Sequence, residues 1–550
     1  MKTIVLNEVG YRVKAHKEAV LNFDAKNFGI FANDGKEVFK GELKHFGKDD
    51  MSGEDTYIAD FSDVCGVGTY YIEADGVKSV SFCIKEEPYN DLMQDLLKTF
   101  YFLRCGCGLD EKFAGVYKHG KCHNALAKVY GDEGTLVDVT GGWHDAGDYG
   151  RYTTAGSIAA AHLLYAFKDY PILKEVKFNI PNDGNFPDIL AEIKVELDFL
   201  MKMQREDGGA YHKVTTLRHA DFIMPEEDRN DLFLFPVSSL ATADLAAVCA
   251  LAYTIYKDYD KEYAGKLLST ATIAYEWLSE NPEEVLFKNP PESNTGEYGE
   301  AEDISNRFWA YASLYAATGD ELYKRELLFT KKRYDLFIEA SKDVPDRQAH
   351  MELSKQRAYT SLGWEEVAGL GTLSILSLGV DDDLFKEVSG YIVKEADRLV
   401  GTSKKNGYGV CMEDADFIWG SNFELGKYMM ILAKAAALTG EKAYTDTLEK
   451  GLGYLLGCNP MNVSYVTGNG ENAFKNPHLR PTAVDGIDLP WPGLVSGGPN
   501  KGLQDELARE VPKDAPPMKC YLDEVPCYSL NEITIYWNSP VVYALASILK

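Results

Sequence analysis

Two patterns of hydrophobic and polar spacing divide the chain near residue 87. Before that point, short runs rich in β-branched and aromatic residues alternate with turn signals such as Asn33-Asp34-Gly35 and Asp75-Gly76. Runs of this kind are typical of β-strands joined by tight turns. We expect about seven strands in residues 1–86, which predicts a small β-sandwich. The clearest strand predictions are 18–23, 28–32, 69–74 and 77–84.

From residue 87 onward, apolar residues recur at spacings of three and four, which predicts amphipathic helices. Twelve helices are predicted, at 89–106, 155–168, 188–204, 236–257, 260–279, 300–317, 320–340, 362–377, 382–399, 420–438, 442–456 and 538–549. Twelve helices fit six helical hairpins, and a closed ring of hairpins would be an (α/α)6 barrel over residues 87–550. Periodicity alone leaves an irregular helical domain as the alternative.

Three long segments lack helical periodicity: 107–154, 205–235 and 457–537. They are rich in Gly, Pro, Asn, His and aromatic residues. Long irregular loops inside a compact domain are usually functional. In a helical barrel we expect them to gather at one end and to build a cleft.

Composition narrows the range of partners. The formal net charge of −28 makes nucleic acid and anionic membranes poor partners, because a surface of that sign repels phosphate. No run of 18 apolar residues occurs, so no transmembrane helix is predicted. The 12% aromatic content can belong to the core, and it also suits stacking on sugar rings. Oligomeric state does not follow from these patterns.

The N-terminal apolar stretch is shorter than a signal peptide requires. The expected location is therefore the cytoplasm, or secretion if a leader was removed beforehand.

The densest group of chemically useful residues is the segment 138–152. Asp145 and Asp148 stand three residues apart among glycines, which allow tight backbone turns and close approach of a substrate. Two neighbouring carboxylates can hold one water, one acting as general base while the other orients it. Trp143 and Tyr149 could stack on sugars. The alternative is a Gly-Asp-rich turn with capping aspartates.

Two later segments add further candidates. His478 and Arg480, in the segment 476–481, could donate hydrogen bonds to hydroxyl groups. Glu532 lies in apolar and aromatic company ahead of the last predicted helix. Partial desolvation would raise its pKa and keep it protonated, as a general acid requires. The alternative is a first-turn glutamate near the helix macrodipole.

Together these three segments resemble the pattern of glycoside hydrolase family 9, and the resemblance covers nearly the whole chain. Further similar blocks are Leu6-Asn-Glu-Val-Gly-Tyr11, residues 204–214, Trp419-Gly-Ser-Asn422 and residues 495–500. The resemblance implies an immunoglobulin-like β-sandwich at 1–86 and an (α/α)6-barrel catalytic domain at 87–550. It implies an inverting hydrolase acting mainly on β-1,4-glucans.

The resemblance also implies roles for individual residues. Asp148 would be the catalytic base, Asp145 would help to hold the water, and Glu532 would be the acid. His478 and Arg480 would bind the sugar beside the scissile bond, with Trp143, Tyr149, Trp419 and Tyr528 as further sugar contacts. In an inverting hydrolase the two carboxyl groups stand about 6.5–9.5 Å apart. Leu479 departs from the family, which commonly has a second His there, and this puts the subsite preference in doubt.

Cys105, Cys122, His123 and His144 form a possible metal-binding series, because two thiolates and two imidazoles suit structural zinc. The residues alone leave open two buried thiols and two hydrogen-bonded histidines, and Cys107 competes as a ligand. The resemblance implies that zinc is held by these four residues. Next to Asp145, such an ion would fix the loop, because four protein ligands leave no open position. Calcium is also implied, without assigned ligands.

The expected substrates are soluble cello-oligosaccharides or other β-1,4-linked glucans. An exo-acting β-glucosidase or exo-β-glucosaminidase on short oligosaccharides is the alternative within the same fold. A non-catalytic carbohydrate-binding protein is the alternative of another class. The joint presence of Asp145, Asp148 and Glu532 argues against simple binding.

Overall fold

The computed structural model describes residues 2–132, 134–340, 347–380 and 382–549. The chain forms two compact units. The first consists of Met1–Thr99 and Ala396–Lys550, and the second is the intervening range Phe100–Glu395. The first unit therefore joins the N-terminal strands to the C-terminal helices, and the second is mostly helical.

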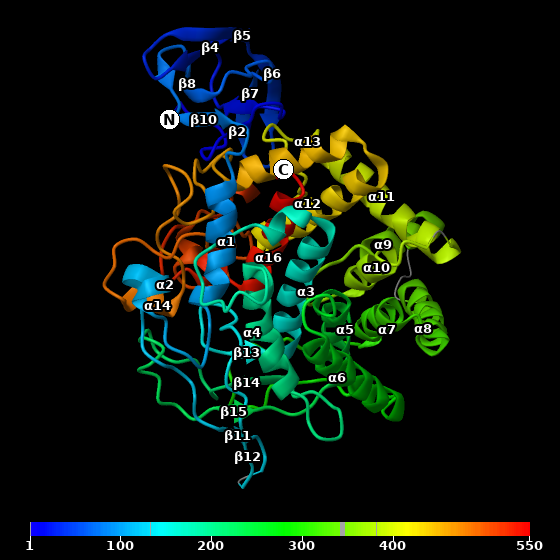
Figure 1. The fold of residues 1–550 in the computed structure, drawn as a ribbon. Helices are drawn as coiled ribbons and strands as arrows, with labels where there is room; N and C mark the ends of the chain where they lie inside the picture. Colours follow the sequence, from blue (N-terminus) through cyan, green and yellow to red (C-terminus); the bar gives the residue numbers. More distant parts are fainter. Residues whose placement is uncertain (1, 133, 341–346, 381, 550) are drawn as a thin grey trace. The chain divides into compact units, whose positions relative to one another are not determined.

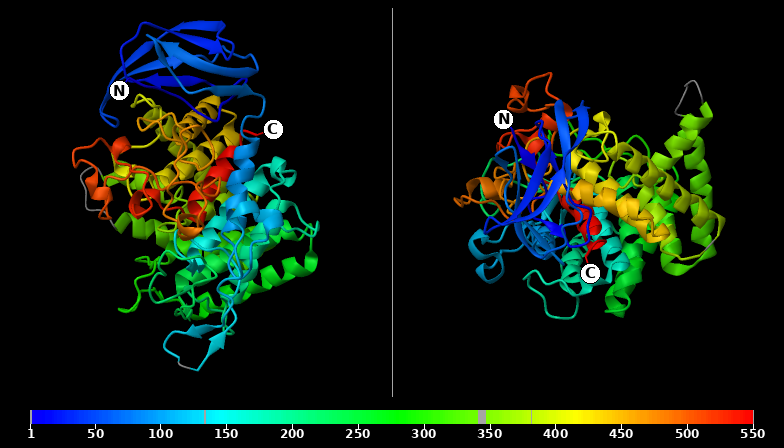
Figure 2. Two further views of the ribbon diagram at one scale, coloured as in Figure 1. Left: turned by 90° about the vertical axis from the view of Figure 1, so that its left-hand side faces the viewer. Right: turned by 90° about the horizontal axis from the view of Figure 1, so that it is seen from above.

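The N-terminal strands form a β-sandwich, drawn in blue in Figures 1 and 2. One sheet has the order β1 (Ile4–Val5), β3 (Glu18–Leu21), β7 (Glu54–Asp60) and β6 (Lys44–Asp49). The other has the order β2 (Tyr11–Arg12), β10 (Phe82–Lys85), β8 (Gly68–Ala74), β4 (Asn27–Ala32) and β5 (Glu37–Glu42), with β9 (Val77–Lys78) beside β8. Buried aromatic rings fill the core, with Tyr11 packed edge-on against Phe61 and Phe82.

Most of the predicted strands are present, and 77–84 is interrupted. Its two halves, β9 and β10, both pair with β8. Between them, the Ser79 hydroxyl accepts the N–H of Ile72 at 2.9 Å, so a side chain replaces one ladder bond. The predicted Asp75-Gly76 turn joins β8 to β9, and both residues have positive φ, 48° and 76°. Two positive φ angles are what a tight type I′ hairpin requires.

Glu8, from the segment between β1 and β2, reaches into the loop that follows α13 (Lys442–Leu455). Its carboxylate accepts the backbone N–H of Asn472 at 2.7 Å and the Asn472 side chain at 2.9 Å. Its own N–H donates to Leu456 O at 2.9 Å. A Cβ at Gly457 or Gly470 would come within 2.6 or 2.8 Å of the Glu8 side chain. The Glu8 side chain is therefore part of the interior of this loop.

The helical part of the first unit is built around α12 (Ser421–Thr439), which packs against α13 and α16 (Ile535–Ala546). Gly440, in the left-handed conformation, ends α12 and allows the short turn into α13. Two short helices, α14 (Arg480–Val484) and α15 (Tyr528–Asn531), lie within the long predicted loop.

In the second unit, α5 (Ser239–Tyr256) packs against α3 (Thr153–Asp169), α6 (Lys261–Glu280) and α7 (Ile304–Thr318). The remaining α-helices of this unit are α2 (Glu111–Ala114), α4 (Asp188–Lys202), α8 (Glu321–Ala340), α9 (Arg347–Ala358) and α10 (Ala368–Leu376). Helices α1 (Asn90–Phe102) and α11 (Asp383–Ser403) run across the unit boundaries. By length and composition α5 could cross a membrane, but 89% of it is buried in the protein. We interpret α5 as the central core helix of this unit.

All twelve predicted helices are present, and most end within a few residues of the expected positions, although α10 begins only at Ala368 where residue 362 was expected. The structure adds α9, whose sequence is too polar to show an apolar stripe. It also adds a five-stranded sheet within the predicted loops, of order β12 (Leu136–Val137), β11 (Ala127–Val129), β15 (Phe233–Leu234), β14 (Lys213–Thr215) and β13 (Arg151–Tyr152). Strands of two or three residues are too short to show an alternating pattern.

The core of the second unit buries several carboxyl groups near the start of α7. Burial raises the pKa of Asp244 to about 7 and that of Glu366 to about 8. Burial also raises the pKa of Glu302 to about 7. Asn306 donates to Asp244 at 3.0 Å, which satisfies one oxygen of that group.

Because of these carboxyl groups, we expect the free energy of unfolding to fall as the pH rises from about 4 to about 8. The folded protein keeps protons on them in this window, whereas the unfolded chain releases them near the ordinary pKa of about 4. Glu366→Gln removes one of these groups, so the fall in melting temperature between pH 5.5 and pH 8 should be smaller than in the wild type. Thermal unfolding at both pH values, without added divalent cations, measures this. An unchanged pH dependence would contradict the role of Glu366.

Candidate active site

The two candidate aspartates lie in a tight turn that leads into β13. The turn closes where the N–H of Asp145 donates to Gly150 O at 3.0 Å. Gly150 is required because a Cβ there would lie 2.6 Å from the Tyr152 hydroxyl and 2.8 Å from Asp148 Oδ2. Gly150 therefore leaves the space in which the Tyr152 hydroxyl and the Asp148 carboxylate meet.

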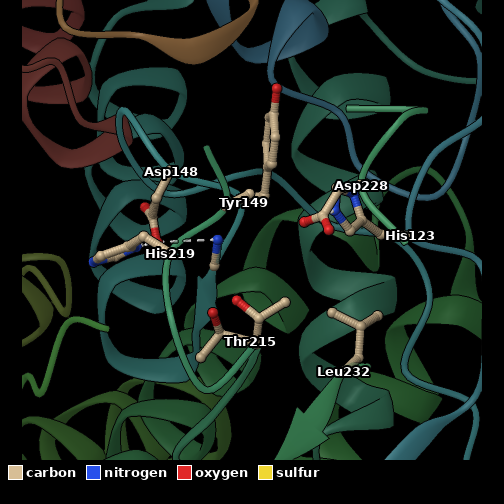
Figure 3. A pocket seen from close by; sticks show the side chains of 10 residues that line it. His123, Asp148, Tyr149, Thr215, His219, Asp228 and Leu232 are labelled. Atoms are coloured by element: carbon tan, nitrogen blue, oxygen red, sulfur yellow. Dashed lines mark hydrogen bonds and ion pairs between the residues drawn. The ribbon is translucent and has the colours of Figure 1, made fainter. Parts of the chain in front are cut away.

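Neighbouring groups hold the Asp148 carboxylate in place. Its Oδ2 accepts the Tyr152 hydroxyl at 3.1 Å and the N–H of Gly150 at 3.2 Å. His219 Nδ1 lies 3.3 Å from the same oxygen. Figure 3 shows Asp148 with His219 at one side of a small pocket of about 10 Å³, which has room for about one water. A carboxylate fixed in this way beside a water-sized space can serve as a general base.

Asp145 is buried, and the Tyr298 hydroxyl donates to its Oδ2 at 2.5 Å. Its Oδ1 has no hydrogen-bond partner among the described residues. Burial, and then the charge of Asp148, raise the pKa of Asp145 well above its usual range. Buried carboxyl oxygens normally have a hydrogen-bond partner, and a bound water would be that partner here.

Sequence reasoning did not single out Tyr298 or His219. His219 lies in the segment 205–235, which was expected to be functional, but a lone His carries no signal of its own. Tyr298 lies in an irregular connection between α6 and α7, with its ring 4.8 Å from that of Tyr152 and 5.2 Å from that of Trp364. Its φ of 46° is unusual for a tyrosine. Non-glycine residues in that region cost on the order of 1–3 kcal/mol and tend to occur at functional sites.

Glu532, the candidate acid, lies in the first unit between α15 and α16. Helix α16 begins at Ile535 with Thr534 as its cap, so Glu532 is outside the first helical turn. That position disfavours the macrodipole interpretation. Because Asp148 belongs to the second unit, the carboxyl separation of about 6.5–9.5 Å stays a prediction.

The segment carrying His478 runs beside Glu532. The N–H of His478 donates to Asn531 O at 2.9 Å, and its Nδ1 lies 2.7 Å from Val525 O. Asp523 accepts the backbone N–H groups of Lys475 and Asn476 at 2.8 and 2.9 Å. These bonds hold the candidate sugar-binding histidine next to the candidate acid.

Other predicted sugar contacts lie in the same unit. The rings of Trp419 and Tyr528 are 5.3 Å apart, and Tyr528 is 5.7 Å from the His478 ring. Trp419 is 40% exposed and can offer its face to a sugar. Arg480 is the first residue of α14 and is largely buried, and Leu479 is buried.

The prediction that Trp143 contacts a sugar is wrong. It is only 1% exposed, its ring packs on Phe100, and its indole N–H donates to Glu192 at 3.0 Å. A side chain buried in this way is part of the core and cannot stack on a sugar. Tyr149 lines the pocket of Figure 3, and its hydroxyl donates to Ile223 O at 2.6 Å.

The four predicted metal ligands come together in a buried cluster. One ligand atom from each of Cys105, Cys122, His123 and His144 lies within 4.8 Å of all the others. Two backbone hydrogen bonds join the segments that carry Cys105 and His144. The N–H of Cys105 donates to Gly142 O at 2.8 Å, and that of His144 donates to Leu103 O at 2.7 Å. The cluster is therefore joined directly to the loop of Asp145.

The donor atoms fit a metal ion. Within the described part of the chain, His123 Nδ1 and His144 Nε2 are buried without hydrogen-bond partners. The other nitrogen of His123, Nε2, lies 3.3 Å from Asp228 Oδ2. A carboxylate behind a histidine is the usual way to orient a metal ligand. Figure 3 shows Asp228 beside His123 on the far side of the pocket from Asp148. His123 has a φ of 42°, a costly conformation that a bound ion would help to hold.

Comparison with known proteins decides the family. The model of glycosyl hydrolase family 9 matches residues 89–545, and that of the cellulase N-terminal ig-like domain matches residues 1–79. The chain belongs to glycosyl hydrolase family 9. It is therefore a glycoside hydrolase, with an immunoglobulin-like sandwich ahead of its catalytic domain.

Relatives of this family 9 enzyme match over the full chain. A cellodextrinase of Butyrivibrio fibrisolvens is 57% identical, with 100% of both chains covered. A mutant of the thermostable endoglucanase of Alicyclobacillus acidocaldarius is 33% identical and covers 100% of both chains with a TM-score of 0.89. A zinc-binding triple mutant of endoglucanase J30 is 29% identical, with 98% of this chain and 99% of that one covered and a TM-score of 0.89. These matches confirm the predicted fold class at the level of a β-sandwich followed by a helical domain like that of the family 9 endoglucanases.

Proposed function

We propose that this family 9 enzyme cleaves β-1,4-linked glucans, and soluble cello-oligosaccharides in particular, with inversion at the anomeric carbon. The observation that carries this proposal is the aspartate pair: Asp148 held by Tyr152 and His219, and Asp145 with one buried oxygen left for a water. The full-length similarity to a cellodextrinase supports the choice of substrate.

In the proposed reaction, Asp148 takes a proton from a water while that water attacks the anomeric carbon. Asp145 accepts the second hydrogen of the water and fixes its direction, with Tyr298 holding the far carboxyl oxygen. Glu532 donates its proton to the glycosidic oxygen as the bond to the leaving sugar breaks. His478, Arg480, Trp419 and Tyr528 hold the sugars on either side of the bond. A single displacement of this kind gives an α-configured product from a β-linked substrate.

The stereochemistry can be tested directly. Proton NMR during the first minutes of cellopentaose hydrolysis should show the α anomer at the new reducing end, before mutarotation. A β anomer at the start would mean retention and would overturn the single displacement.

Asp148→Asn is expected to lower kcat by about 10²- to 10⁴-fold, because the water loses its general base. KM should change little, since the carboxylate acts on the water and not on the sugar. Steady-state kinetics with cellopentaose measure both parameters. Asp138→Asn, an exposed aspartate in the same segment, is the control and should behave as the wild type. Full activity in Asp148→Asn would remove Asp148 from its role.

Product analysis separates the remaining alternatives. Glucose alone from cellopentaose would indicate exo-β-glucosidase action, and glucosamine from chitosan oligomers would indicate an exo-β-glucosaminidase. Mixed cello-oligosaccharides are the result that we expect. Family membership already favours hydrolysis over a role restricted to carbohydrate binding.

We further propose that the metal of the Cys-His cluster is a structural zinc, as the Cys₂His₂ donor set favours. Zinc would fix the backbone next to Asp145 and would take no part in the proton transfers. Calcium, also implied by the family resemblance, stays a prediction without assigned ligands. The proposed location is the cytoplasm, in keeping with soluble oligosaccharide substrates, and cell fractionation tests it.

A further inference from the structure

Lys213 is a buried lysine on β14, the strand that pairs with β13 directly after the aspartate loop. It is the cross-strand partner of Tyr152 on β13, and the two strands lie side by side (Figure 1). Its side chain is fully buried, and its ammonium lies 4.6 Å from the centre of the Phe235 ring. Lysines are almost never buried to this extent unless paired, so this one requires an explanation.

All three ammonium hydrogens of Lys213 have acceptors on one segment, residues 289–296. They are Asn289 Oδ1 at 2.6 Å, Thr295 Oγ1 at 3.0 Å and Gly296 O at 2.6 Å. The neighbouring His212 adds a bond from its Nε2 to Glu297 O, at 2.8 Å. The segment has no helix or strand of its own, and the Lys213 ammonium joins three of its residues to β14.

The ordered segment leads to both aspartates. The N–H of Gly296 donates to the Tyr152 hydroxyl at 3.1 Å, and that hydroxyl donates to Asp148 at 3.1 Å. Two residues further on, Tyr298 donates to Asp145. Because Tyr298 stands at an unfavourable φ of 46°, its backbone needs neighbours that keep it there.

We propose that Lys213 is a positioning residue of the reaction: by holding residues 289–296, it sets the hydroxyls of Tyr152 and Tyr298 on Asp148 and Asp145. The ammonium touches neither the water nor the sugar, and it acts only through these two tyrosines. This inference rests on the proposed roles of the two aspartates.

A side chain without hydrogen-bond donors cannot replace Lys213. Lys213 makes three bonds to oxygen atoms, which matches the three donors of an ammonium group. Burial lowers the pKa of Lys213 to about 7, while the carboxylates of Asp148 and Glu297 favour its charged form. Methionine has a similar length and no donors, so it would remove all three bonds and loosen the segment.

Lys213→Met is therefore expected to lower kcat on cellopentaose by about 10- to 100-fold, the loss typical of a misplacement near 1 Å. KM should change by less than about threefold, since no sugar contact is removed. Lys331→Met is the matched control: Lys331 is also buried, and it pairs with Asp335 at 3.1 Å and with Glu387 at 2.7 Å on α8 and α11. That variant should lose stability and keep kcat.

A double-mutant cycle with Tyr298→Phe distinguishes positioning from a general loss of stability. If Lys213 acts through Tyr298, the double variant should lose much less than the product of the two single losses in kcat. Fully multiplicative losses, or a kcat in Lys213→Met as high as in Lys331→Met, would overturn the inference. If Lys213→Met does not fold, Thr295→Val takes its place in the cycle with Tyr298→Phe, because it removes one acceptor of the Lys213 ammonium.

Asp148→Asn, assayed in parallel, distinguishes a failure of the positioning role of Lys213 from a failure of the proposed base. If it is inactive while Lys213→Met behaves as the control, only the positioning role fails. If Asp148→Asn is fully active, the proposed base is wrong and the role of Lys213 fails with it.

Discussion

Glu532→Gln should lower the hydrolysis of cello-oligosaccharides by about 10²- to 10⁴-fold, because glutamine cannot give a proton to the leaving sugar oxygen. Binding should persist, since glutamine has the same size and keeps its hydrogen-bonding capacity. Calorimetric titration with cellotetraose and steady-state kinetics on the same preparation measure the two effects. Turnover at the wild-type rate would remove Glu532 from the acid role.

The leaving group offers a sharper test of the same residue. An aryl cellobioside with a strongly acidic phenol departs without protonation, so Glu532→Gln should retain much more of its activity on that substrate. Asp148→Asn should be impaired on both substrates, because the attack by water still needs a base. Glu524→Gln is the control, as Glu524 is an exposed neighbour on the same segment. An equal loss on natural and activated substrates would argue against acid catalysis by Glu532.

Loss of the proposed zinc is expected to lower the stability of the enzyme strongly. Cys122→Ser removes one of four ligands from a buried cluster and leaves His123 and His144 with unsatisfied nitrogens. Structural zinc sites contribute directly to folding free energy. We expect about one zinc per chain in the wild type, almost none in Cys122→Ser, and a melting temperature lower by on the order of 10 °C.

Cys107→Ser provides the matched control. Cys107 is a half-buried neighbour that does not belong to the cluster of four ligands, so its replacement should keep both zinc and stability. Metal analysis of the purified proteins and thermal unfolding read out the two properties. Zinc retained by Cys122→Ser, or lost by Cys107→Ser, would show that the ligand set is wrong.

The helices and most strands could be predicted because their signals are local. The apolar stripes of α3 to α8 and the Asp75-Gly76 turn are set by neighbouring residues, so spacing was sufficient. The candidate metal ligands were predicted from the resemblance to family 9, since the residues alone left buried thiols and hydrogen-bonded histidines as the alternative. Each of these predictions depended on residue type and order, without knowledge of tertiary contacts.

What escaped prediction depends on contacts between distant parts of the chain. Tyr298 reaches Asp145 from 153 positions away, and nothing in its neighbourhood marks it. Trp143 was expected to face a sugar because it lies beside the aspartates, yet Phe100 and Glu192 enclose it. Alternation and spacing do not reveal which side of an irregular loop faces the interior.

The Glu8 carboxylate has a consequence for how this enzyme can be shortened. A side chain from the N-terminal module completes the packing of a catalytic-domain loop, the one that leads on toward His478. Deleting the module would leave two glycines facing an empty space and an asparagine without its acceptors. The boundary between the modules in the sequence is thus not a boundary in the folding of the enzyme. A catalytic fragment that begins after the sandwich would be an incomplete protein.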